Sequence, residues 1–367
     1  MTRLIVAAGG GGDAVAAAML DAALYGADQH PTVILTYAWD RLLIDPVPGP
    51  RGPDDFTGLE QITPVVWAVP AGARPVAPAG SMLPRLASEL PYTFALIDPR
   101  HGVEGLTRQL EELVRHFSPV SIDLLDVGGD ILARGDEPTL KSPLADAVTL
   151  AACCQVNASI RLLVAGPGLD GELPLDDDLQ GVLGPLVHNF TADDVEPVGS
   201  VLEWHPSEVT GMLAATARGV RGVCEVRDAG LPVALTDVGP TVHEVDLDEA
   251  LSRNRLARSI LETASLNDVE AHSREVCGYS EIDSERSKAA RLLERSATEL
   301  DPVATLSTAL SRLDAFESLA RSRGVTHTTF RRLTEALGLN GSQRARLRQL
   351  LISRRPEQYA APLWRIP

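Results

Sequence analysis

Short apolar runs alternate with helix-length stretches along most of this chain. The run Leu4–Ala8 precedes the Ala-rich stretch Asp13–Tyr25, and the run Thr93–Ile97 precedes the amphipathic stretch Val103–Phe117. Strands that alternate with helices pair in parallel, because each helix crosses back over one face of the sheet. Such sheets are buried on both faces, which suits a chain with 44% hydrophobic but only 4% aromatic residues. The alternation therefore predicts an α/β fold with a mostly parallel sheet flanked by helices.

The same pattern gives the expected elements. The predicted strands are Leu4–Ala8, Thr32–Ala38, Val65–Val69, Thr93–Ile97, Val120–Val127, Ile160–Ala165, Val201–Trp204, Gly222–Val226, Val233–Leu235 and Val242–Val245. The predicted helices before residue 284 are Asp13–Tyr25, Met82–Glu89, Val103–Phe117, Pro143–Val156, Leu179–Leu186, Pro206–Arg218 and Asp248–Thr263. After about residue 284 the strand signal stops, and four more helices are expected at Ser287–Leu300, Val303–Ala320, Thr328–Leu337 and Ser342–Ile352. We expect an α/β domain over residues 1–283 and a helical C-terminal module over residues 284–367.

Four consecutive glycines, Gly9, Gly10, Gly11 and Gly12, connect the first strand to its helix and are followed by Asp13. Ligands of open α/β sheets bind outside the carboxyl ends of the strands. Glycines let the backbone approach a ligand closely, and the helix start offers N–H groups to an anion. The spacing fits neither GxGxxG nor the P-loop. We expect the four glycines to contact a cofactor, with Asp13 either capping its helix or acting as a catalytic group.

The segment SIDLLDVGGDILARGDEPTLKSPLADAVTLAA, which starts at residue 121, is the longest run of chemically active residues. Asp123 and Asp126 are three residues apart, so a regular strand places them on opposite faces of the sheet. Acids gathered after the strand could bind a divalent cation, bind a cationic substrate, or act as general acid and base. We expect catalytic roles for Asp126, Asp130 and Glu137, cofactor contacts for Gly128 and Gly129, and a substrate contact for Ser142, which with Pro143 starts a helix that has Asp146 in its first turns.

Further strand ends carry polar residues. Arg100 is expected to bind a substrate anion and His101 to transfer a proton, although a surface turn would explain both. In the sequence GPGLDGE, Asp170 is a candidate substrate ligand. Asp40 follows the second strand too far from the glycines for the ribose-binding role, so we interpret it as a solvated loop acid. His205 is expected to be a satisfied loop residue.

Charge is distributed unevenly along the chain. The formal net charge is −17, yet residues 321–367 hold ten arginines and only two acids. Their helix–turn–helix spacing is compatible with DNA binding. The acidic remainder would repel DNA, so we expect these arginines to pack on the chain itself or on another subunit, and no nucleic-acid partner.

The cysteines and the apolar runs indicate the compartment. Four cysteines lack disulfide or metal spacing, which favours free thiols in a reducing cytoplasm. The start of the chain carries no signal-peptide pattern. The apolar runs are shorter than the roughly 18 residues of a membrane span. We expect a cytoplasmic protein without a membrane partner; a homodimer is compatible with this composition.

Three motifs together resemble one family. GGGGD, DVGGDILARGDEPTLKSPLADAVTLAA and GPGLDGEL are similar to the DUF1152 family over roughly residues 1–280. The resemblance implies a Rossmann-like α/β domain whose shared site is formed by the glycine- and aspartate-rich strand ends. It implies no catalytic residue, because the family has no assigned function.

These features predict an enzyme that acts on a small polar substrate. We expect group transfer or hydrolysis of an amino-acid- or nucleotide-like metabolite by acid/base or metal-assisted chemistry. The cofactor stays unassigned between a nucleotide and a divalent metal, and no metal ligand is assigned. A metabolite-sensing protein with a basic partner- or nucleic-acid-binding tail is the first alternative. An NAD(P)-dependent oxidoreductase is the second, weakened by the imperfect fingerprint and the absence of a redox cysteine pair.

Overall fold

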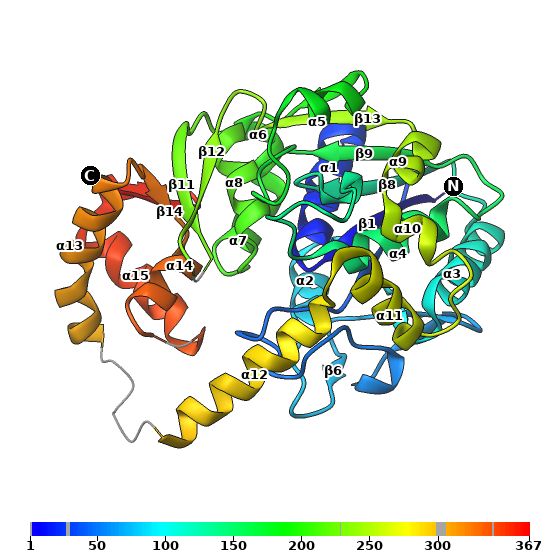
Figure 1. The fold of residues 1–367 in the computed structure, drawn as a ribbon, viewed down its shortest axis with the longest axis horizontal. Helices are drawn as coiled ribbons and strands as arrows, with labels where there is room; N and C mark the ends of the chain where they lie inside the picture. Colours follow the sequence, from blue (N-terminus) through cyan, green and yellow to red (C-terminus); the bar gives the residue numbers. More distant parts are fainter. Residues whose placement is uncertain (1, 27–29, 228, 299–305, 340) are drawn as a thin grey trace.

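A nine-stranded sheet forms the centre of the molecule, in the order β10-β13-β9-β8-β1-β2-β7-β5-β4 (Figure 1). The computed structural model describes residues 2–26, 30–227, 229–298, 306–339 and 341–367. The strands are β1 Arg3–Gly10, β2 Thr32–Tyr37, β4 Glu60–Thr63, β5 Val66–Ala68, β7 Thr93–Leu96, β8 Ser121–Val127, β9 Arg161–Ala165, β10 Leu186–Asn189 and β13 Thr241–Val245. The five inner strands, β9 to β7, are parallel, and at each end two further strands are added by antiparallel pairing. The predicted α/β fold with a parallel central sheet is confirmed.

The strand order reverses at β1. Along the chain, β2 and β7 are added on one side of β1, whereas β8 and β9 are added on the other side. Ile5 of β1 accordingly lies opposite Ile34 of β2 and opposite Asp123 of β8. Crossovers that leave in opposite directions open a crevice outside the carboxyl ends of the two strands, here β1 and β8.

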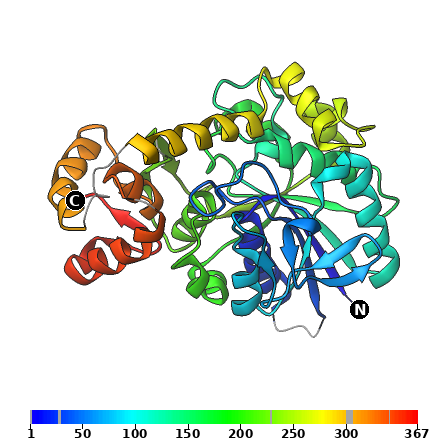
Figure 2. The same cartoon turned by 90° about the horizontal axis from the view of Figure 1, so that it is seen from below.

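Helices cover both faces of the central sheet (Figure 2). One face packs against α3 Gly102–Phe117, α4 Pro143–Cys153, α5 Asp177–Val182, α9 Leu247–Arg253, α10 Arg255–Ser259 and α11 Leu266–Cys277. The other face packs against α1 Gly12–Tyr25, α2 Leu83–Glu89, α6 Ala192–Val195, α7 Gly199–Leu202 and α8 Glu208–Ala217. Alternate residues of β1 enter the two cores: Leu4 and Val6 enter the first, Ile5 and Ala7 the second. Burial on both faces explains why β1 reads as a continuous apolar run.

A second sheet joins the C-terminal segment to the middle of the chain. Its order is β12-β11-β14-β16-β15. The strands are β11 Gly222–Val226, β12 Leu231–Leu235, β14 His327–Thr328, β15 Tyr359–Ala360 and β16 Leu363–Arg365. The expected C-terminal helices are present as α12 Glu281–Thr298, α13 Leu306–Ser322, α14 Phe330–Ala336 and α15 Arg344–Arg354. The strands β14, β15 and β16 were not predicted, because two or three residues are too few to show a period.

The helix α12 runs from the central region towards the other C-terminal helices (Figures 1 and 2). It spans the position between residues 283 and 284 where we place the domain boundary, and that boundary stays a prediction. Residues 299, 300 and 303–305, which belong to two predicted helices, lie outside the described residues.

Some sequence predictions were wrong. The expected strand Val201–Trp204 does not form, because Val201 and Leu202 end the short helix α7 and the next two residues form a turn. The expected helix Asp248–Thr263 is divided into α9 and α10 at Asn254, whose side chain accepts a hydrogen bond from the Ala257 N–H and starts the second helix. The expected helix Leu179–Leu186 ends at Val182 and is followed by β10. The helix α11 was not predicted, and β3 Phe56–Thr57 pairs with β6 Arg74–Pro75 in a region expected to be irregular.

Candidate functional site

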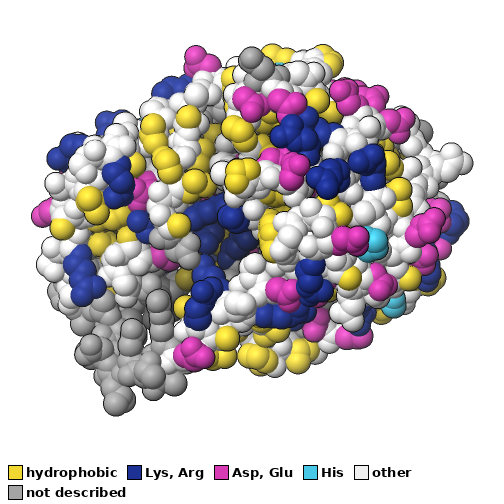
Figure 3. All heavy atoms as spheres, in the orientation of Figure 1, with side chains coloured by type: hydrophobic (Ala, Val, Ile, Leu, Met, Phe, Trp, Pro, Cys, Tyr) yellow, Lys and Arg dark blue, Asp and Glu magenta, His cyan; other side chains and the backbone are white. Residues whose placement is uncertain are grey.

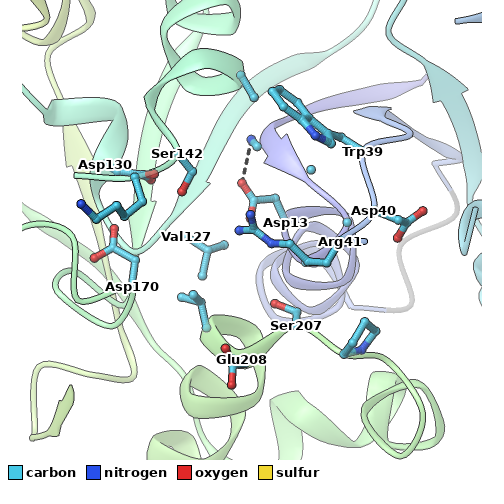
Figure 4. Close-up of a pocket in the computed structure, with 18 of the residues that line it drawn as sticks. Asp13, Trp39, Asp40, Arg41, Val127, Asp130, Ser142, Asp170, Ser207 and Glu208 are labelled. Atoms are coloured by element: carbon cyan, nitrogen blue, oxygen red, sulfur yellow. Dashed lines mark hydrogen bonds between the residues drawn. The ribbon is translucent and has the colours of Figure 1, made fainter. Parts of the chain in front are cut away.

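A cavity of about 320 Å³ lies at the carboxyl ends of the inner strands, where the strand order reverses. Figure 3 shows a hollow in this face of the molecule with Lys and Arg side chains along its edge. Strand ends supply the floor, and α8, α12 and α14 supply the remaining wall. In the close-up, Asp130, Ser142 and Asp170 come from one side of the cavity, and Trp39, Asp40 and Arg41 from the other (Figure 4). Asp13 lies between the two groups.

The four glycines at the junction of β1 and α1 line the cavity, but neighbouring protein atoms leave no room for a side chain at most of them. A Cβ atom at Gly10 would lie 2.8 Å from the backbone oxygen of Trp39, and one at Gly12 would lie 2.2 Å from the Ser207 Oγ. Gly11 differs, because a Cβ there would meet nothing closer than 3.8 Å, while its φ of 49° favours glycine. The tight approach of chain segments therefore explains Gly10 and Gly12, and Gly11 faces the open part of the loop.

Asp13 is the second residue of α1 and does not cap this helix. The residue before α1 is Gly11, and no side chain caps it. The Asp13 Oδ2 atom instead accepts a hydrogen bond from the Gly9 N–H at 2.8 Å (dashed in Figure 4). Burial raises the pKa of Asp13 to about 7, although the Gly9 N–H and Arg41 act in the opposite direction. The side chain is thus held in the cavity floor as an acid that resists ionisation.

Asp13, Asp126 and Asp146 form a carboxylate cluster, with one oxygen atom of each within 4.8 Å of the others. They come from the start of α1, the end of β8 and the first turn of α4. The Asp126 Oδ2 accepts a hydrogen bond from the Gly129 N–H at 2.8 Å. The Oδ1 atoms of Asp126 and Asp146 are buried and have no hydrogen-bond partner among the described residues. Burial, reinforced by the neighbouring carboxylates, raises the pKa of both groups well above the ordinary value.

Two more aspartates extend the acidic floor. Asp130 and Asp170 both line the cavity, and burial raises the pKa of Asp170 to about 7. The Asp170 Oδ1 accepts the Glu172 N–H at 2.7 Å, whereas its Oδ2 is buried without a partner in the described part of the chain. For Asp130, burial and then the charge of Asp146 raise the pKa well above its ordinary range.

Glu172 is a buried acid of the cavity that, unlike these aspartates, has several partners. Its carboxylate pairs with the Arg227 guanidinium at 2.5 Å and accepts hydrogen bonds from the Lys141 N–H and the Ser142 N–H and hydroxyl. Burial alone would raise its pKa, but Arg227 and these donors lower it below the ordinary value. Ser142, predicted to contact substrate, is therefore bound to Glu172 while also lining the cavity.

Asp40 and His205 are more buried than the sequence analysis suggested. Asp40 is 6% exposed and His205 is 9% exposed, so the interpretation of Asp40 as a solvated loop acid was wrong. Both residues line the cavity beside Gly11. Their position at a strand end was the available signal, and only the fold could show their burial.

Five cations, each from a different part of the chain, reach the wall of the cavity. They are Arg41, Lys141, Arg227, Lys288 of α12 and Arg331 of α14. Arg41 lies 3.8 Å from Glu281, and Arg331 lies 3.4 Å from Glu208. The cavity thus combines an acidic floor with a basic wall, and the wall includes residues from the C-terminal segment.

Several predicted residues lie elsewhere. Arg100 pairs with Asp98 and Asp54, and neither Arg100 nor His101 lines the cavity. Glu137 accepts hydrogen bonds from the Arg134 and Gly135 N–H groups and also lies outside the lining. Gly128 and Gly129 also lie outside the lining of the cavity. Their positive φ values of 121° and 108° turn the chain after β8.

The C-terminal arginines are largely engaged within the chain. Glu225 of β11 is fully buried and pairs with Arg323 and with Arg332, the latter at 2.7 Å. Arg348 pairs with Glu203, and Arg355 pairs with Asp314 and Glu317. The expectation that these arginines pack on acidic residues of the chain agrees with the observed ion pairs.

The fold and the cavity define an α/β protein with a carboxylate-lined cavity at the carboxyl ends of its parallel strands. The chain belongs to the family described as "Protein of unknown function (DUF1152)", which matches residues 4–289. No curated protein and no solved structure matches the chain. Within the described residues, no helix has both the length and the apolar character needed to cross a membrane.

Proposed function

We propose that this protein is an enzyme that holds a divalent cation on Asp13, Asp126 and Asp146 and carries out group transfer or hydrolysis on a small polar metabolite. The observation that carries the proposal is the cluster itself, with three carboxylate oxygens within 4.8 Å of one another. Hard divalent cations such as Mg²⁺ and Mn²⁺ prefer oxygen ligands of this kind. The buried Oδ1 atoms of Asp126 and Asp146 have no protein partner in the described chain, which a cation would supply.

The negative charge of the cluster also favours a bound cation. Buried carboxylates crowded together destabilise one another unless protons or cations compensate their charge. Among the described residues, the Oδ1 atoms of Asp126 and Asp146 meet no arginine or lysine donor, and the Oδ2 of Asp126 is bonded to a backbone N–H. A divalent cation would act as a Lewis acid on a phosphoryl or carbonyl oxygen of the substrate. Asp130 and Asp170, also in the floor, are the candidate proton-transfer groups.

The basic wall supports an anionic group on the substrate. Arg41, Lys141, Lys288 and Arg331 surround the acidic floor, so an anion can meet cations while its reacting end approaches the cluster. The strand order supports a Rossmann-like reading of the sheet, since β7-β2-β1-β8-β9 is the 3-2-1-4-5 order of dinucleotide-binding folds. A nucleotide-like substrate is the form of anionic metabolite that this arrangement favours.

The proposal is tested first by cation binding. The full chain, freed of metal with EDTA, is titrated with MnCl₂ by calorimetry. Asp146→Asn is the test variant, and Asp237→Asn, whose side chain is 97% exposed, is the matched control. Wild type and the control should bind Mn²⁺, and Asp146→Asn should bind it roughly tenfold or more weakly. Absence of binding, or equal binding by all three proteins, would overturn the proposal.

Turnover is tested with the same proteins. A panel of nucleotides and amino acids is incubated with each protein and Mn²⁺, and consumption is followed by mass spectrometry. The proposal requires consumption of at least one compound by wild type and Asp237→Asn that is lost in Asp146→Asn.

A further inference from the structure

We propose that Asp40 and His205 form a subsite for a vicinal diol, such as that of a ribosyl group, at the part of the cavity next to Gly11. This inference rests on the proposed function only in taking the cavity as the substrate site. Nothing in the family match assigns a ligand to these residues.

The two side chains face the same free space. A Cβ atom at Gly11 would lie 3.8 Å from the Asp40 Oδ1 and 3.9 Å from the His205 Cε1, so both groups border the open side of this one residue. Both atoms that could bond a ligand, the Asp40 Oδ1 and the His205 Nε2, are buried and have no partner among the described residues. Buried polar atoms are normally paired, so a ligand that pairs both of them removes an unfavourable feature of the empty cavity.

The existing hydrogen bonds define what each atom can offer. The His205 Nδ1 accepts the Ser207 N–H at 3.3 Å, which leaves the proton of the neutral ring on Nε2. Burial and the charge of Arg344 lower the pKa of His205 to about 3, so the ring is neutral at physiological pH. The Asp40 Oδ2 accepts the Met82 N–H at 3.0 Å. Burial raises the pKa of Asp40 to about 7, so its Oδ1 accepts a hydrogen bond in the ionised form and can donate one in the protonated form. With Asp40 ionised, the pair presents one donor and one acceptor.

This pairing selects the ligand class. An ammonium or guanidinium group has only donors and would leave the His205 N–H unpaired. A phosphate or carboxylate has only acceptors and would be repelled by Asp40. Two adjacent hydroxyls satisfy both atoms, because one donates to the Asp40 Oδ1 while the other accepts from the His205 Nε2. The surroundings of Asp40 act on its pKa through the charge of Asp45, which raises it, and through the Ser81 side chain and Arg41, which lower it. A diol suits either form of the Asp40 carboxyl, because each hydroxyl can both donate and accept a hydrogen bond.

The position in the fold agrees with this assignment. Asp40 follows β2, the strand beside β1, and an acid at this place binds the ribose hydroxyls in many Rossmann folds. Gly11 borders this subsite and is two residues before Asp13 in the chain, so a nucleotide could place its ribose here and its phosphate towards the carboxylate cluster and the basic wall.

The test compares adenosine 5′-monophosphate with its 2′-deoxy analogue by calorimetry in the presence of Mn²⁺. Wild type should bind the ribonucleotide roughly 10-fold to 100-fold more tightly, because the deoxy analogue leaves a buried partner unpaired. Asp40→Asn retains the shape of the side chain and can still accept the Met82 N–H, but it places a donor where the Oδ1 was. This variant should bind both nucleotides within about twofold of each other.

Two histidine variants complete the test. His205→Asn can keep an acceptor for the Ser207 N–H but lacks the Nε2 donor, whereas His205→Gln can keep a donor near the Nε2 position. The preference for the ribonucleotide should fall in His205→Asn and persist at least in part in His205→Gln. Thermal melting of each variant shows whether it folds. If His205→Asn does not fold, the comparison of Asp40→Asn with wild type still tests the subsite.

The outcomes separate this inference from the proposed function. Equal binding of the two nucleotides by wild type, or no binding of either, overturns the diol subsite. Mn²⁺ binding that is lost in Asp146→Asn would then still support the proposed enzyme. A ribonucleotide preference without any Mn²⁺ binding would uphold the subsite and overturn the metal-dependent function. Selective binding of a carboxamide such as nicotinamide, which also offers a donor and an acceptor, in place of the ribonucleotide overturns the diol assignment.

Discussion

The carboxylate of Asp13 accepts a hydrogen bond at 2.8 Å from the backbone N–H of Gly9, four residues earlier in the chain. This bond closes the glycine loop and directs the side chain towards Asp126 and Asp146 rather than along the axis of α1. The loop after β1 is thus built to present a carboxylate, at the expense of the stability of the metal-free chain.

That relationship predicts a stabilising substitution. Because burial raises the pKa of Asp13 in the folded chain to about 7 from an ordinary value of 3.8, the folded state holds its proton more tightly than the unfolded state. The carboxyl therefore costs nothing below pH 3.8, and its destabilising effect grows with pH up to about 7. Asp13→Asn should raise the free energy of unfolding of the EDTA-treated protein at pH 8 by up to about 4 kcal/mol.

Urea denaturation at pH 4, 6 and 8 measures this effect. The advantage of Asp13→Asn should be largest at pH 8 and close to zero at pH 4, and the same variant should bind Mn²⁺ weakly. An Asn variant that is less stable than wild type at pH 8 would contradict the prediction. Asp237→Asn, at an exposed position, should show no such pH dependence.

The glycine loop makes a second prediction. Gly10→Ala should lower the free energy of unfolding by about 1–3 kcal/mol, because its Cβ would lie 2.8 Å from a backbone oxygen of Trp39 that cannot move aside freely. Gly72→Ala is the matched control, since a Cβ there meets nothing within 4 Å. Chemical denaturation of both variants gives the comparison, and equal stabilities would show that the loop tolerates a side chain.

A third prediction concerns the buried Glu225. Glu225→Gln removes the charge that pairs with Arg323 and Arg332, so it should lower the free energy of unfolding by about 3 kcal/mol. Glu104→Gln, at an exposed position on α3, is the control and should change stability little. The prediction is wrong if guanidinium denaturation finds the two variants equally stable.

The fourth prediction tests the C-terminal segment as a whole. Residues 1–298 retain α12 but lack β14, β15 and β16, so β11 loses its parallel partner. An unpaired strand with hydrogen-bonding groups exposed promotes association, so this fragment should form oligomers or aggregates at concentrations at which the full chain does not. Light scattering after size-exclusion chromatography measures this. A fragment that elutes as a single species in the same oligomeric state as the full chain, and that melts like the full chain, would contradict the prediction.

The sequence predicted the inner part of the fold well because β1, β2, β7, β8 and β9 are long apolar runs with helices between them. Their parallel pairing followed from that alternation. The outer strands and the second sheet were harder to predict from the sequence. Pairing such as Cys224 with His327 depends on contacts between distant parts of the chain, which local composition does not encode.

The candidate site was predicted in part. Asp13 and Asp126 were expected to be functional from their places at strand ends, and the structure brings them together with Asp146. Asp146 was noted only for its place in a helix start, because its nearness to Asp126 depends on how α4 packs. Arg100 and His101 were also expected at the site because they follow a strand. That strand, β7, lies on the side of β2 away from β1, and its end does not reach the cavity.

The pairing of β11 with β14 has a consequence for how the protein is made. Glu225 and its partner residue Thr328 are separated by 103 residues, so a ribosome synthesises the strand long before its neighbour exists. During that interval the acidic side chain of Glu225 lacks its arginines, and the cavity lacks Arg331. The acidic floor of the cavity is therefore synthesised early, whereas its basic wall is completed only when the C-terminal segment has emerged.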